Sequence, residues 1–150
     1  MPQSSKPVTI LIAEDDADDR LLAQEALQES RLRNEVQFVY DGEELLDYLR
    51  RQGKYADAVA PRPGVILLDL NMPRKDGREA LTEIKKDADL RRIPIVVMTT
   101  SKAEEDILRS YDLGVNSFII KPVTFEGLVE VMRTLGHYWF EIVELPPQAA

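Results

Sequence analysis

Short, uninterrupted apolar runs recur along the chain and divide it into similar units. Such a run, four or five residues long and bounded by polar or turn-forming residues, is typical of a strand that is covered on both faces. We therefore predict five strands, at Thr9–Ala13, Val36–Tyr40, Val65–Asp69, Ile95–Thr99 and Ser117–Ile120.

A stretch with helical spacing of apolar residues follows each run. The first is predicted to reach about Ser30 after a cap at Asp16 or Asp18. Its inward side is predicted to carry Leu21, Leu22, Ala26 and Leu27. The second helix is predicted over Glu43–Arg51 with Leu45, Leu46 and Leu49 inward, and the third across Ala80, Leu81 and Ile84. The fourth is predicted over Ala103–Leu113 and ends before Gly114. The fifth is predicted to begin near Thr124 and to carry Leu128, Val131, Met132 and Leu135.

This alternation of strand and helix predicts the architecture. Five strand–helix units with apolar strands favour an α/β fold, a doubly wound five-stranded parallel sheet with helices on both faces. The segment Gln52–Gly64, with two Gly and two Pro, is predicted to be an internal loop, because the pattern resumes directly after it.

Composition narrows the classes of protein. A chain of 150 residues makes one domain with at most a short appendage. The net charge of −8 disfavours direct nucleic-acid binding, and the absence of Cys excludes disulfides, zinc–thiolate sites and iron–sulfur clusters. No apolar run approaches the ~18 residues of a membrane span, and the first residues lack the apolar core of a secretory signal. We expect a cytoplasmic protein without a membrane partner.

The ends of the predicted strands carry the candidate chemistry. In open α/β sheets the functional crevice lies beyond the carboxyl ends of the strands. Polar side chains follow four of them: Glu14 and Asp15, then Asp69, then Thr99 and Thr100, then Lys121. Clustered carboxylates repel one another unless a cation lies among them, and an all-oxygen donor set favours Mg²⁺.

Each feature alone has an ordinary explanation. Acidic residues are common at helix N-termini, where they interact favourably with the helix dipole. A single Asp at a strand end is often a cap, and a Lys beside a Pro is usually a surface residue. The signal is the joint occurrence of these residues at the ends of the first, third and fifth predicted strands.

These motifs resemble the response-regulator receiver domain. The matching segments are Ile-Leu-Ile-Ala-Glu14-Asp15-Asp16, Leu-Leu-Asp69-Leu-Asn71-Met-Pro73 with Gly77, Met98-Thr99, and Phe118-Ile-Ile-Lys121-Pro122. The resemblance covers a receiver domain at residues 8–135 and implies a flavodoxin-like (βα)5 fold. It implies signalling by phosphoryl transfer from a sensor histidine kinase, and not an enzyme with a metabolic substrate.

The resemblance also implies roles for single residues. Asp69 would be the phosphoacceptor, and Thr99 and Lys121 would contact the phosphoryl oxygens. Asp15, Asp69 and the backbone carbonyl of Asn71 would bind Mg²⁺, with Glu14 behind them or bound through water. Thr99 and Phe118 would form the switch that changes the surface of the fourth helix, fifth strand and fifth helix.

Two other classes use related folds or chemistry. A haloacid-dehalogenase-like phosphohydrolase needs a second Asp two residues after the nucleophile, where this chain has Asn71. A flavodoxin-like flavin binder needs a phosphate-binding loop after the first strand, where Glu14-Asp15-Asp16 would repel a phosphate. The effects of Asp16 near the metal and of Thr100 beside Thr99 stay open.

A narrower resemblance concerns the subfamily. The segments Arg51-Gln-Gly-Lys-Tyr55, Asn71–Arg78, Glu104–Leu113 and Tyr138-Trp139-Phe140 are similar to regulators paired with phytochrome histidine kinases. Residues 136–150 would then be an extension, and no output domain is expected to follow. The apolar spacing of Leu135, Tyr138, Trp139, Ile142 and Val143 predicts a homodimerisation arm, the alternative being a lengthened last helix that folds back.

Overall fold

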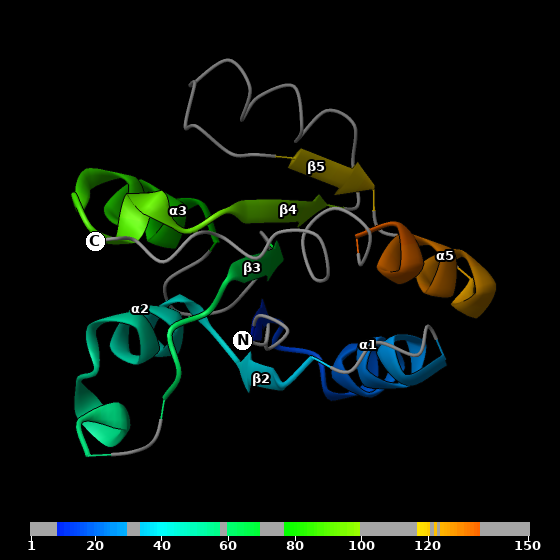
Figure 1. The fold of residues 1–150 in the computed structure, drawn as a ribbon, viewed down its shortest axis with the longest axis horizontal. Coiled ribbons are helices and arrows are strands. Elements are labelled where there is room, and N and C mark those ends of the chain that lie inside the picture. Colours follow the sequence, from blue (N-terminus) through cyan, green and yellow to red (C-terminus); the bar gives the residue numbers. More distant parts are fainter. Residues whose placement is uncertain are drawn as a thin grey trace, which may run out of the picture.

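The chain folds around one parallel sheet. The computed structural model describes residues 9–29, 34–57, 60–69, 77–99, 117–120, 122 and 124–135. Its strands form a five-stranded sheet in the order β2-β1-β3-β4-β5 (Figure 1). They are β1 (Ile10–Ala13), β2 (Val36–Val39), β3 (Val65–Asp69), β4 (Ile95–Thr99) and β5 (Ser117–Ile120). The predicted doubly wound parallel sheet is confirmed.

Helices cover both faces of this sheet (Figure 1). Within the described ranges they are α1 (Ala17–Glu29), α2 (Gly42–Arg50), α3 (Gly77–Lys86) and α5 (Phe125–Leu135). Helices α1 and α5 lie together on one face, and α2 and α3 on the other. The helix predicted over Ala103–Leu113 and the extension at 136–150 lie outside the described residues. None of the described helices is long and apolar enough to cross a membrane.

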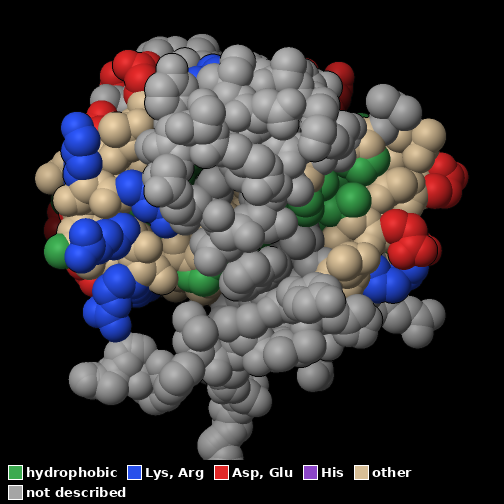
Figure 2. Space-filling model, turned by 90° about the horizontal axis from the view of Figure 1, so that it is seen from above, with side chains coloured by type: hydrophobic (Ala, Val, Ile, Leu, Met, Phe, Trp, Pro, Cys, Tyr) green, Lys and Arg blue, Asp and Glu red, His purple; other side chains and the backbone are tan. Residues whose placement is uncertain are grey.

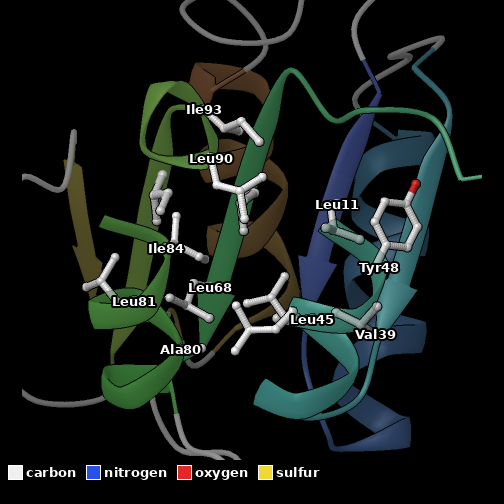
Figure 3. Packing of buried hydrophobic residues seen from close by; sticks show 14 of the residues in the cluster. Leu11, Val39, Leu45, Tyr48, Leu68, Ala80, Leu81, Ile84, Leu90 and Ile93 are labelled. Atoms are coloured by element: carbon white, nitrogen blue, oxygen red, sulfur yellow. The ribbon is translucent and has the colours of Figure 1, made fainter. Parts of the chain in front are cut away.

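Successive side chains along each strand point to opposite faces of the sheet and contribute to two hydrophobic cores. Leu11, Ile66 and Leu68 point to the α2–α3 side, where they pack with Leu45, Leu81, Ile84 and others (Figure 3). Ile10, Ile12, Val65 and Leu67 point to the α1–α5 side and pack with Ala26, Leu27 and Met132. Because successive side chains in a strand point to opposite faces, both cores require the strands to be apolar throughout.

The predicted inward face of α1 is partly wrong. Leu21 is 55% exposed and Leu22 is 40% exposed, whereas Ala23, Ala26 and Leu27 are buried. At about 100° per residue, Leu21 lies on the far side of the helix from these three residues and Leu22 lies at the edge of their arc. Small alanines let α1 lie close to the sheet and leave two leucines at the surface.

The loop after α2 contains a short 3-10 helix, η1 (Gly53–Tyr55), inside the predicted loop Gln52–Gly64. Arg51 has a left-handed backbone with φ of 57° and closes α2 through its N–H, which donates to the carbonyl of Tyr48. Its Nη1 donates to the carbonyl of Ala60 at 2.8 Å. This turn carries Lys54 and Tyr55 back to the start of α2. A second 3-10 helix, η2 (Leu90–Arg92), precedes β4.

Candidate functional site

Three carboxylates meet at the carboxyl end of β1 and β3. One oxygen from each of Glu14, Asp15 and Asp69 lies within 4.8 Å of the others. We call these three residues the acidic cluster. Glu14 and Asp69 are buried, at 5% and 6% exposure, and Asp15 is exposed. The structure thus brings together three residues that the sequence places at the ends of neighbouring strands.

The strand register brings the cluster together. Ala13 of β1 is the partner of Leu68 of β3, so the residues that follow, Glu14 and Asp69, leave two adjacent strands side by side. By alternation, both continue the row of side chains that faces α1 and α5. Asp15 is the first residue of the turn that leads into α1. The site is therefore built from the central strand pair of the sheet.

The cluster has the electrostatics of a cation site. Two carboxylates at this separation repel by roughly 3.5 kcal/mol at an effective dielectric constant of about 20. Burial of Glu14 and Asp69 keeps water from screening that repulsion fully. Carboxylate oxygens are the donors that hard divalent cations prefer, so the donor set fits such an ion. Part of the orientation is fixed locally, because the Asp16 N–H donates to Glu14 Oε2 at 3.2 Å.

Asp16 does not belong to the cluster. Its Oδ1 accepts hydrogen bonds from the backbone N–H groups of Asp18 at 2.8 Å and Asp19 at 3.2 Å. This is the N-cap of α1, one of the two caps that the sequence allows. This carboxylate could have added a charge to the metal site, but it instead accepts hydrogen bonds from backbone N–H groups in the first turn of α1.

Arg20 is a residue of the site that the sequence analysis missed. Its Nη1 donates to the carbonyl oxygens of Glu14 at 3.0 Å and Asp15 at 2.9 Å. Its Cζ lies 4.1 Å from the centroid of the Tyr40 ring. The only signal in the sequence is a basic residue one helical turn into α1 after an acidic segment, which is common at any helix start.

Other predicted site residues are described only in part. Thr99 ends β4, which pairs with β3, and Phe118 lies in β5, the edge strand that pairs with β4, but their side chains are not described. Asn71, Thr100 and Lys121 lie outside the described residues. The structure therefore brings Glu14, Asp15 and Asp69 together, and the roles of all the predicted site residues stay predictions.

An apolar cavity opens beside the cluster, between α1 and α5. Its volume is about 100 Å³, and Glu14 and Asp19 line it together with Ile12, Leu22, Ala23, Met98, Pro122, Phe125, Leu128 and Met132. Phe125 is 37% exposed at the first turn of α5. Figure 2 shows apolar side chains at the surface on the α5 side and Lys and Arg side chains on the α3 side.

Comparison with known proteins agrees with this geometry. Residues 10–133 match the response regulator receiver domain. The chain is 43% identical to the response regulator Rcp1 of Synechocystis sp. over 144 residues, which is 96% of this chain and 97% of that protein.

Solved structures give the same result. The phosphorylated cyanobacterial phytochrome response regulator RcpA is 47% identical, with a TM-score of 0.79 over 89% of this chain and 94% of that one. The Mn²⁺-bound form of Rcp1 is 44% identical, with a TM-score of 0.81 over 93% of this chain and 99% of that one. The phosphohydrolase and flavin-binding alternatives receive no support. The match over most of the chain, together with the acidic cluster at the predicted strand ends, shows that this chain belongs to the response regulator receiver family.

Proposed function

We propose that the chain accepts a phosphoryl group on Asp69 from a phosphohistidine of a sensor histidine kinase. One observation carries this proposal: the carboxylate of Asp69, at the end of the central strand, lies within 4.8 Å of two further carboxylates that suit a divalent cation. A carboxylate is a modest nucleophile, so transfer to it depends on positioning and on neutralising charge.

The transfer step balances without a further reactant. A carboxylate oxygen of Asp69 attacks phosphorus, the phosphorus–nitrogen bond to the donor histidine breaks, and the imidazole nitrogen keeps the electron pair. The product is an acyl phosphate on Asp69. Asp15, Asp69 and the backbone carbonyl of Asn71 would hold Mg²⁺, with Glu14 behind them or bound through water, and the ion would supply positive charge to neutralise the phosphoryl oxygens.

The remaining roles follow the family resemblance. Lys121 and Thr99 would contact the phosphoryl oxygens of the product. Movement of Thr99 toward the phosphoryl group would let Phe118 turn inward, and Phe has no hydroxyl, so this switch would depend on packing alone. The chain would signal through the changed surface of its fourth helix, β5 and α5. It would assist its own phosphorylation and dephosphorylation without acting on a separate substrate.

We infer that the partner kinase is a phytochrome. The inference is supported by the 47% identity to RcpA, which is described as a cyanobacterial phytochrome response regulator. The kinases of this class consume ATP, so we place the protein in the cytoplasm. We further propose a receiver domain at 8–135 and an extension at 136–150 that joins two copies into a homodimer.

Phosphotransfer from a purified, autophosphorylated phytochrome kinase tests the proposal. Wild type should become labelled in the presence of Mg²⁺, and Asp69→Asn, which keeps the shape but removes the nucleophile, should not become labelled. The matched control is Asp16→Asn, because Asp16 caps α1 and an Asn can keep that cap. Labelling of Asp69→Asn at the wild-type rate would contradict the assignment of Asp69 as the phosphoacceptor.

A further inference from the structure

Arg20 makes contacts that the phosphotransfer step itself does not require. It lies in the first turn of α1, and its guanidinium reaches back to the backbone of the acidic cluster. One nitrogen, Nη1, donates to the carbonyl oxygens of both Glu14 and Asp15, at 3.0 Å and 2.9 Å. These are the two residues that supply the β1 side of the cluster. A single side chain thus holds two consecutive peptide units of the turn.

The guanidinium is itself held by Tyr40. Its Cζ lies 4.1 Å from the ring centroid, a distance at which a cation interacts favourably with an aromatic face. Tyr40 directly follows β2, and its N–H donates to Glu44 Oε1 at 2.7 Å. The N–H of Glu14 donates to the carbonyl of Val39 at 2.9 Å. The ends of β1 and β2 and the start of α1 are therefore joined around Arg20.

The acidic cluster needs such support. Glu14 and Asp15 are adjacent residues, whose side chains would diverge in an extended strand, yet an oxygen of each lies within 4.8 Å of Asp69. Their mutual repulsion favours a turn in which they separate. A hydrogen-bonded clamp on both carbonyl oxygens restricts the backbone rotations that would allow this.

We propose that Arg20, held by Tyr40, is a positioning residue that sets the divalent-cation affinity of the acidic cluster. This inference rests on the proposed cation site. The inference predicts the direction in which loss of Arg20 changes the Mg²⁺ affinity, because the positive charge of Arg20 and its hydrogen bonds have opposite effects on that affinity. A cation beside the site repels Mg²⁺, so loss of the charge alone would tighten binding, whereas loss of the clamp weakens it.

Calorimetric titration of the full chain with Mg²⁺ separates these effects. Arg20→Ala should weaken binding about tenfold, the lower end of the loss seen when a residue that orients metal ligands is removed. Arg20→Lys keeps the charge and an ammonium group that can donate hydrogen bonds, but it lacks the planar guanidinium face, so it should recover only part of the affinity. Tyr40→Phe should bind like wild type and Tyr40→Leu should bind less tightly, because only the latter loses the aromatic ring.

Arg50→Ala is the matched control for the lost positive charge. Arg50 pairs with Glu83 of α3 at 3.3 Å and belongs to α2, so its removal should leave Mg²⁺ affinity unchanged. Circular dichroism melts in EDTA show whether each variant is folded. If Arg20→Ala does not fold, the Arg20→Lys and Tyr40→Leu affinities decide the matter.

Equal or tighter Mg²⁺ binding in folded Arg20→Ala, or wild-type affinity in both Arg20→Lys and Tyr40→Leu, would overturn the inference. Failure of the proposed function looks different. In that case wild type itself would not bind Mg²⁺, or Asp69→Asn would bind it as tightly as wild type does.

Discussion

Adjacent residues of the same type serve different purposes at the end of β1. The carboxylate of Asp15 belongs to the acidic cluster, whereas that of Asp16 accepts the N–H groups of Asp18 and Asp19. The difference comes from the backbone: Asp15 directly follows Glu14, the residue that leaves β1 beside Asp69, and Asp16 is already at the start of α1. The chemistry of the two side chains is identical, so position alone separates ligand from cap.

This separation predicts that the two alanine substitutions affect different properties of the protein. Asp15→Ala should weaken Mg²⁺ binding strongly, at least tenfold, because a charged ligand is lost from a site with few others. Asp16→Ala should lower the free energy of unfolding by about 1 kcal/mol, the usual loss for a helix N-cap, and change Mg²⁺ affinity little. Calorimetric titration and urea denaturation measure the two quantities. Equal Mg²⁺ affinities in wild type and Asp15→Ala would refute the ligand assignment.

Residue types at strand ends were sufficient to predict the acidic cluster, but not the residue that holds it. Glu14, Asp15 and Asp69 stand out because charged side chains interrupt apolar runs. Arg20 binds backbone carbonyl oxygens, which every residue has, so no partner residue in the sequence marks the contact. Its ring partner Tyr40 is twenty positions away, beyond β2, and only the folded sheet brings the two together.

At the scale of elements, continuous apolar runs located the strands well. The bounds predicted for β3, β4 and β5 agree with the structure residue for residue. The face of α1 was harder to predict, because Leu21 and Leu22 outweigh Ala23 in any estimate based on hydrophobicity. Close packing of α1 against the sheet instead selects the small residues.

Helix α2 begins in a polar network that responds to pH. Glu44 Oε2 accepts from Lys54 Nζ and from the Tyr55 hydroxyl, each at 2.7 Å, and Oε1 accepts the N–H of Tyr40. Burial raises the pKa of the Glu44 carboxyl, but the hydrogen bonds from Lys54, Tyr55 and Tyr40 together hold the pKa below its ordinary value of 4.5. A lowered pKa in the folded state stabilises the fold above the unfolded value and loses this contribution as pH falls through the folded value.

Glu44→Gln should therefore remove a pH-dependent part of the stability. At pH 7 we expect the free energy of unfolding to fall by about 1.5–3 kcal/mol, as for hydrogen bonds to a charged group. The difference from wild type should shrink as the pH falls below 4.5, where the wild-type carboxylate becomes protonated. Urea denaturation between pH 3 and 7 measures this, with exposed Glu43→Gln as the control. A wild-type pH slope in Glu44→Gln would contradict the prediction.

At the scale of the whole molecule, the sequence pattern predicted the parallel sheet but not the association of copies. Within the described residues, α1 and α5 cover one apolar face of the sheet and α2 and α3 cover the other, so the apolar pattern of this part of the chain needs no second copy. The apolar residues after Leu135 continue the helical spacing, but the sequence does not show which surface they pack against. An arm across a dimer and a longer last helix would use the same residues.

Truncation after Gly136 tests the proposed dimer. Each buried aromatic side chain removes roughly 150–250 Å² from water, worth several kcal/mol for the set, so we expect the full chain to be a twofold dimer at tens of micromolar. The truncated chain should be a monomer by light scattering and should still bind Mg²⁺ with wild-type affinity. If the full-length chain is a monomer at that concentration, residues 136–150 do not form a dimerisation arm.

The position of the acidic cluster across β1 and β3 has a thermodynamic consequence. These strands pair at the centre of the sheet, so the carboxylates converge only in the folded chain. Without a cation, their repulsion opposes folding, and a cation that binds only the folded state offsets it by about 2.7 kcal/mol at a hundred times its dissociation constant. The midpoint of thermal unfolding should therefore rise with the logarithm of the free Mg²⁺ concentration above the dissociation constant, and the concentration at which this rise begins reports the affinity of the folded chain for the cation.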